Sequence, residues 1–242
     1  MTRVLERLGH SVVFPREQTC CGQMHYNTGY HREAVPLVRR FVQMFREAEC
    51  VCVPSASCVA MMREHYELIA KHENDAALLA DVRALLPRVF EFSELLTERL
   101  KMEDVGAIFA HSVTYHPSCH SLRMLNIREG PLKLLRAVRG LELRDLPEKE
   151  QCCGFGGTFA VKNADVSAAM LEAKEVCVLQ TGAEVVAALD FGVGGHLAHV
   201  RGVVLAMVLK VGEQDAVAQE DAVVVRMPQP AMVVSTVGQT AA

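Results

Sequence analysis

A pair of adjacent cysteines followed by glycine occurs twice in this chain of 242 residues, and no other feature constrains its fold as strongly. The pairs lie in Cys20-Cys21-Gly22 and in Cys152-Cys153-Gly154. Adjacent thiols place two soft ligands on one short turn, and a glycine lets the backbone bend sharply beside them. We therefore expect the rest of the chain to bring further cysteines to these two turns.

The segments around the two turns follow one plan, in which helices alternate with short apolar strands. Helices are expected over 30–48, 59–69, 131–138 and 166–180, and strands over 10–14, 49–54, 113–116, 141–144 and 184–189. Ser57 is the expected N-cap of the second of these helices. This alternation predicts an α/β fold made of two duplicated units, with short, largely parallel sheets flanked by helices.

The repeat divides the chain into four expected segments: a first Cys-Cys-Gly unit over 1–72, a helical linker over 73–110, a second unit over 111–190 and a divergent tail over 191–242. In the tail, 203–208 and 222–225 are candidate strands that the repeat does not account for. When Cys20 is aligned with Cys152 in the sequence, Cys119 has no counterpart in the first unit. We therefore expect that this unit lacks its N-terminal strand.

Charge and hydropathy exclude several classes of protein. The net charge of −4 gives no reason to expect nucleic-acid binding. No apolar run approaches the roughly 20 residues that span a bilayer, and the amphipathic start is not a secretory signal. We expect a cytoplasmic protein, in which cysteines serve as ligands or catalytic groups more often than as disulfides.

Six cysteines are the candidate ligands, in two sets of three: Cys20, Cys21 and Cys58, and Cys119, Cys152 and Cys153. Thiolates on glycine-bearing turns at strand ends suit an iron–sulfur cluster. Structural zinc usually takes ligand pairs separated by two to four residues, and redox thiols usually form Cys-x-x-Cys. Zinc, a redox pair and inert buried cysteine stay open beside the favoured iron–sulfur interpretation.

The remaining cysteines are expected to pack in the core as small apolar side chains: Cys50, Cys52 and Cys177. His116 and His120 flank Cys119, and polar loop histidines are favoured there over ligands. His196 and His199 form a weak metal-binding pattern in the tail. No residue has an independent signature of a catalytic base, so the catalytic residues stay unknown.

Together these residues resemble the cysteine-rich CCG domain that occurs in heterodisulfide reductase and in the glycolate oxidase iron–sulfur subunit. The sequence is more similar still to the lactate utilization protein A family. The resemblance covers about residues 1 to 190. The stretches that carry it are 14–30, 53–62, 115–120 and 152–162.

The resemblance implies an iron–sulfur subunit of a multi-subunit oxidoreductase of the L-lactate dehydrogenase type, which acts with partner subunits in oxidising L-lactate to pyruvate. It places the ligands of a cluster, of 4Fe–4S type, on the six cysteines. The chain departs from the family at Val193, where a final cysteine is expected. Two alternatives stay open: a glycolate oxidase or heterodisulfide reductase type of iron–sulfur subunit, and a non-catalytic zinc-binding or metal-free assembly subunit.

Overall fold

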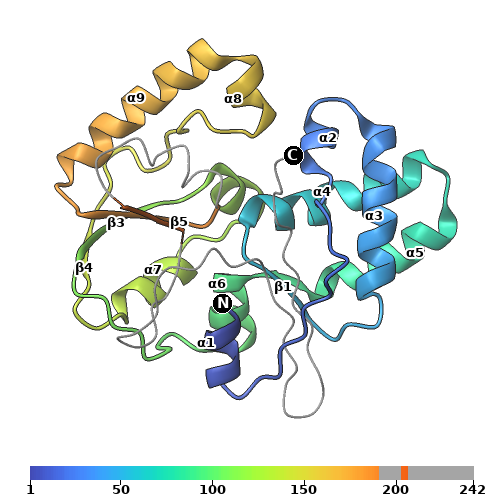
Figure 1. Cartoon of the computed structure of the whole chain (residues 1–242), viewed down its shortest axis with the longest axis horizontal. Helices are drawn as coiled ribbons and strands as arrows, with labels where there is room; N and C mark the ends of the chain where they lie inside the picture. The colour runs from blue at the N-terminus through green and yellow to red at the C-terminus, as the bar shows by residue number, and fades with distance from the viewer. Residues whose placement is uncertain (191–202, 207–242) are drawn as a thin grey trace. The chain divides into compact units, whose positions relative to one another are not determined.

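A computed structural model of the chain describes residues 1–190 and 203–206 (Figure 1). The described residues form two compact units that divide between Leu95 and Leu96. Each unit combines helices with short parallel strands, as the α/β prediction requires. No helix in this part of the chain is long and apolar enough to cross a membrane. The segment boundaries expected from the repeat stay predictions.

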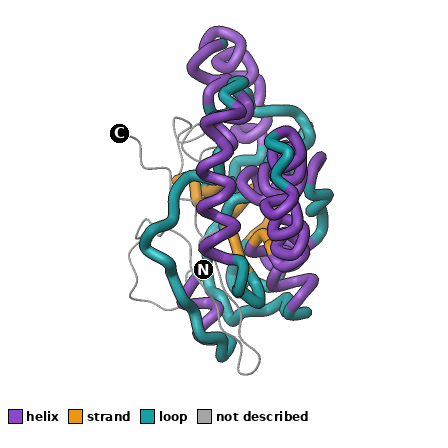
Figure 2. Tube along the Cα trace, turned by 90° about the vertical axis from the view of Figure 1, so that its right-hand side faces the viewer, coloured by secondary structure: helices purple, strands orange, loops and turns teal. Residues whose placement is uncertain are grey.

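The first unit is mainly helical, with two short strands. Its elements are α1 (Thr2–Arg7), α2 (Gln23–Asn27), α3 (His31–Phe45), β1 (Val51–Val53), α4 (Ala56–His72), α5 (Ala76–Leu85), the 3₁₀ turn η1 (Leu86–Arg88), β2 (Val89–Glu91) and α6 (Phe92–Glu94). The expected helices over 30–48 and 59–69 correspond to α3 and α4. Figure 2 shows the short strands among longer helices.

The core of the first unit lies between β1 and the inner faces of its helices. Helix α3 buries residues three and four positions apart, from Ala34 to Phe45, which is the spacing that predicted it. All of β1 is buried, and it pairs in parallel with β2, Val51 opposite Val89. A fully buried strand reads as an apolar run, which explains why the chain reads Val51-Cys52-Val53 there.

Two sequence predictions for the first unit are wrong. The expected strand over 10–14 forms no strand, and Val13 and Phe14 are 38% and 41% exposed. The linker expected to be helical over 73–110 contains the strand β2 (Val89–Glu91). Three residues are too few to show the alternation that identifies a strand.

The second unit holds a four-stranded parallel sheet in the order β4-β3-β5-β6. Its elements are η2 (Leu95–Arg99), which starts at the boundary, β3 (Ser112–His116), η3 (His120–Met124), α7 (Gly130–Arg136), β4 (Glu142–Arg144), α8 (Thr158–Lys162), α9 (Ala164–Gln180), β5 (Val185–Ala188) and β6 (Val203–Ala206). The candidate strand over 203–208 is thus confirmed as β6, beside β5. The other candidate, 222–225, lies outside the described residues.

The order of the strands places helices on both faces of this sheet. From β3 the chain passes through α7 to β4, and then back through α9 to β5 on the other side of β3. Right-handed crossovers in opposite directions put their helices on opposite faces, and Figure 1 shows α7 and α9 on either side of β3 and β5. The carboxyl ends of β3, β4 and β5 therefore share one edge, where ligand sites of such sheets form.

Candidate functional site

The first cysteine turn is shaped by Gly22. This glycine has a φ of 86°, which is a left-handed conformation that side chains disfavour, and it precedes α2. In that conformation its N–H points back at the Cys20 Sγ, at 3.4 Å. Cys21 is buried, and its carbonyl accepts a hydrogen bond of 3.1 Å from the buried Tyr66 hydroxyl.

Cys58 reaches the same place from the first turn of α4. The helix begins at Ala56 because Ser55 caps it, accepting the Cys58 N–H at 3.4 Å. Ser55 rather than the predicted Ser57 is therefore the N-cap; the extended backbone of Ser55 aims its hydroxyl at the helix end. The Gln23 side-chain amide donates to the Ser57 carbonyl at 3.1 Å, which ties the cysteine turn to α4.

The three sulfurs of the first unit interact with one another. Hydrogen bonding from the Cys21 thiol, assisted by the Gly22 N–H, lowers the pKa of Cys20 to about 6. The pKa of Cys21 is raised well above its usual range. The first cause is the hydrogen bonds of its thiol with Cys20 and Cys58, and the second is its burial. Cys20 therefore becomes a thiolate more readily than Cys21.

The second turn is fixed on α9 by Gly154. Its φ is 82°, and its N–H faces the Cys152 Sγ at 3.5 Å, as Gly22 does in the first unit. A Cβ at this position would press directly against the Ser167 carbonyl and lie 2.9 Å from the Met170 Cβ. The Ser167 hydroxyl in turn donates to the Gly154 carbonyl at 2.9 Å.

Cys119 approaches this turn from the carboxyl end of β3, just before η3. Burial, followed by the proximity of Cys152, raises the pKa of Cys119 to about 11. Burial also raises the pKa of Cys153. The structure thus brings each predicted set of three cysteines together within its own unit.

Two further polar groups lie beside the second set and were not predicted as a pair. Lys174 is fully buried on α9, and its ammonium donates to the Glu148 carbonyl at 2.6 Å. His116 is 1% exposed, so the expectation of a polar loop histidine is wrong: it ends β3 inside the unit. Burial, followed by the proximity of Lys174, lowers the pKa of His116 to about 4. The imidazole is therefore neutral near pH 7.

The sequence holds a signal for Lys174 in the spacing of its neighbours. It lies four residues after Met170 and three before Cys177, at the spacing of one helix face. A lysine among apolar residues at that spacing indicates either an exposed edge or a buried charge with a specific partner. The periodicity alone cannot separate these two cases.

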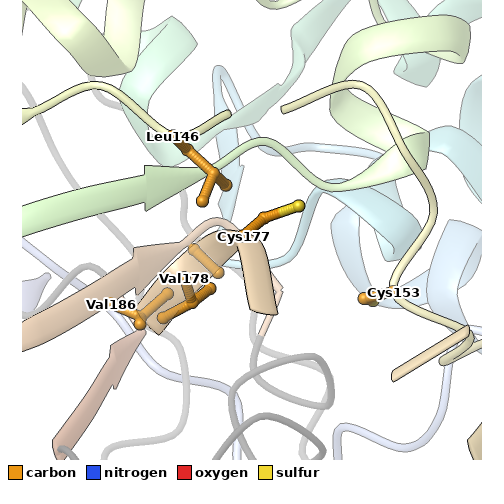
Figure 3. Close-up of a cluster of buried hydrophobic side chains, with 6 residues drawn as sticks. Leu146, Cys153, Cys177, Val178 and Val186 are labelled. Atoms are coloured by element: carbon orange, nitrogen blue, oxygen red, sulfur yellow. The ribbon is translucent and has the colours of Figure 1, made fainter. Parts of the chain in front are cut away.

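The cysteines expected to pack in the core do so. Cys50 and Cys52 are buried at β1, and Cys177 is buried on α9. Cys177 belongs to an apolar cluster that also contains Leu146, Val178 and Val186, drawn in Figure 3. The weak pair His196 and His199 lies outside the described residues.

The donor chemistry of both sets fits an iron–sulfur cluster. Each supplies three cysteine sulfurs and a glycine N–H that faces the first cysteine of the adjacent pair. Among residues 1–190 and 203–206, no three His, Cys, Asp or Glu side chains are arranged to hold a single metal ion. The thiolates of a cluster bind different irons and need not converge on one point, so this arrangement is compatible with a cluster.

Comparison with known proteins identifies the relatives of the chain. The sequence matches the cysteine-rich domain family CCG over residues 1–63 and 113–192. It is 46% identical to lactate utilization protein A of Bacillus velezensis over 198 residues, which are 80% of this chain and 82% of that protein. The chain belongs to the lactate utilization protein A family of proteins with the cysteine-rich CCG domain.

The chain is similar to further lactate utilization protein A sequences. Identity is 42% to lactate utilization protein A of Bacillus subtilis, over 80% of this chain and 82% of that protein. It is 40% to the protein of the same name from Geobacillus kaustophilus, over 81% and 83%. The two CCG segments each contain one set of three cysteines, so the resemblance read from the cysteine turns is confirmed.

Proposed function

We propose that this chain binds iron–sulfur clusters through its two sets of cysteines and transfers electrons in the oxidation of L-lactate. The observation that carries the proposal is the repeated site: three interacting cysteines beside a left-handed glycine whose N–H faces a sulfur. The lactate part rests on the relatives, whose name assigns them to lactate utilization.

The residues of each site have distinct roles in this proposal. A bound cluster would supply one-electron redox chemistry. Cys20, Cys21 and Cys58 would hold it in the first unit, and the glycine N–H would stabilise thiolate charge. The second set, Cys119, Cys152 and Cys153, would do the same at the carboxyl edge of the parallel sheet. Burial of Cys21 and Cys153 keeps water from part of each site.

The test of cluster binding is the metal and sulfide content of protein purified and reconstituted without oxygen. We expect iron and acid-labile sulfide in similar amounts, visible absorption that bleaches on reduction, and an EPR signal in one redox state. Zinc without sulfide would support the assembly-subunit alternative instead, and a colourless, metal-free protein would contradict the proposal.

The substrate is tested separately, by deleting the gene in its host. We expect growth on L-lactate to be lost and growth on glycolate to be retained, because the relatives are lactate utilization proteins. The reverse pattern would assign the chain to glycolate oxidation while leaving the iron–sulfur proposal intact.

A further inference from the structure

Lys174 is a buried cation in the second unit that hydrogen-bonds to a backbone carbonyl. Its side chain is fully buried, and its one hydrogen bond goes to a neutral group, the Glu148 carbonyl, at 2.6 Å. Within the described part of the chain, no carboxylate forms an ion pair with its Nζ. Burying an ammonium without a countercharge costs several kcal/mol. An anion beside the ammonium would offset this cost.

The groups that face Lys174 indicate where that anion lies. Burial lowers the pKa of Lys174, and the nearby sulfurs of four cysteines partly offset that shift: Cys177, Cys153, Cys119 and Cys152. Three of them are the proposed ligands of the second unit. The hydrogen bond to Glu148 holds the lysine at the loop that carries Cys152, and the contact of Ser167 with Gly154 fixes that loop on the same helix.

The first unit has no equivalent charge among its described residues. Aligning Glu49 with Glu184 places Arg39 opposite Lys174, but the Arg39 side chain is 47% exposed and pairs with Asp75. The buried group at the first cysteine turn is the hydroxyl of Tyr66, which is neutral in its ordinary state. The two sites therefore differ in electrostatics although their turns have the same geometry.

We propose that Lys174 is the countercharge of an anionic thiolate-ligated group held by Cys119, Cys152 and Cys153, and that it favours the reduced state of that group. This inference rests on the proposed iron–sulfur function. A cluster ligated by thiolates carries negative charge, and reduction adds one more. A fixed cation in a dry site stabilises the more negative state more strongly. Lys174 acts on the potential without being a ligand.

The test compares Lys174→Met, which keeps the side-chain length and removes the charge, with Lys174→Arg, which keeps the charge. Lys162→Met removes the same charge from an exposed position in the second unit. In the reconstituted proteins, a redox titration followed by EPR gives the midpoint potential of each signal. We expect Lys174→Met to lower one midpoint by about 59 mV or more, a tenfold shift for a one-electron couple. Lys174→Arg and Lys162→Met should leave it within half that shift.

Thermal unfolding provides a second readout that does not depend on redox activity. In the metal-free protein, Lys174→Met removes an uncompensated buried charge, so we expect a higher Tm than wild type. In the reconstituted protein the same change removes the countercharge, so we expect a lower Tm or faster loss of iron. A change of the same sign in both states, or an unchanged midpoint, would overturn the inference. Iron-free wild-type protein would instead contradict the proposed function itself, and the inference with it.

Discussion

Gly154 and Gly22 have the same backbone conformation but different surroundings. At Gly22 an added Cβ would make an ordinary contact of 3.5 Å with the Ala34 Cβ, so only the positive φ demands glycine. At Gly154 the same Cβ would collide with α9, so both the φ and the packing demand it. The second turn is therefore the less tolerant of substitution.

Gly154→Ala should lower the free energy of unfolding by about 3 kcal/mol, of which about 1 kcal/mol comes from the strained φ and about 2 kcal/mol from overpacking. Gly106→Ala is the matched control, because Gly106 also has a positive φ in the second unit and nothing within 4 Å of the added Cβ. It should cost about 1 kcal/mol. Urea unfolding measures both values, and equal losses would show that contact with α9 is unimportant.

Glu91 gives the first unit a predicted pH dependence. Its carboxylate is 1% exposed, and burial raises its pKa to about 7 although Ser93 and Glu94 donate to it. A carboxyl whose pKa is raised by folding binds its proton more tightly in the folded state. Stability is therefore greatest below the unfolded pKa of about 4.3 and falls as the pH rises through the folded value.

Replacing Glu91 with Gln should remove the loss of stability that accompanies the rise in pH. The free energy of unfolding of Glu91→Gln, compared with that of wild type, should rise by about 2 kcal/mol on going from about pH 5 to about pH 8. Linkage requires this for a pKa shift of this size. Urea unfolding at the two pH values measures the difference. The exposed change Glu47→Gln controls for net charge, and a Glu91→Gln effect that does not vary with pH would refute the assignment.

At the scale of elements, the long helices and buried strands were predictable and the short or capped features were not. Helix α3 repeats its apolar residues over four turns, which fixes both its type and its buried face. Strand β2 has three residues and is recognised only through its partner β1. The cap of α4 lies two residues before the predicted one because two serines compete for the role, and only their backbone conformation decides.

The cap of α4 accepts a hydrogen bond from the Cys58 N–H, and its contribution to stability can be tested by substitution. Ser55→Ala should lower the free energy of unfolding by about 1 kcal/mol, the usual cost of an N-cap. Ser57→Ala is the matched control in the same segment and should cost less than half as much. If Ser57→Ala proves the more harmful in chemical unfolding, the predicted cap was right and the structural one wrong.

At the scale of the whole molecule, the cysteine turns predicted the duplicated α/β fold and the family, because both depend on residues that are close in sequence. The grouping of three cysteines in each unit also followed from the repeat. The burial of Lys174 and of His116 could not be predicted from the repeat. The region that encloses them is formed by β3 and by α9, which begins some 50 residues further along the chain. Their roles depend on tertiary packing.

Each unit is proposed to hold its own cluster on three cysteines. The most direct measurement is iron and sulfide content, with EPR, of anaerobically reconstituted Cys58→Ser and Cys153→Ser, beside Cys177→Ser as a buried cysteine outside both sets. We predict that each of the first two variants loses about half of the iron and a different EPR component, and that Cys177→Ser keeps both. Full iron and an unchanged spectrum in Cys58→Ser and Cys153→Ser would contradict the account.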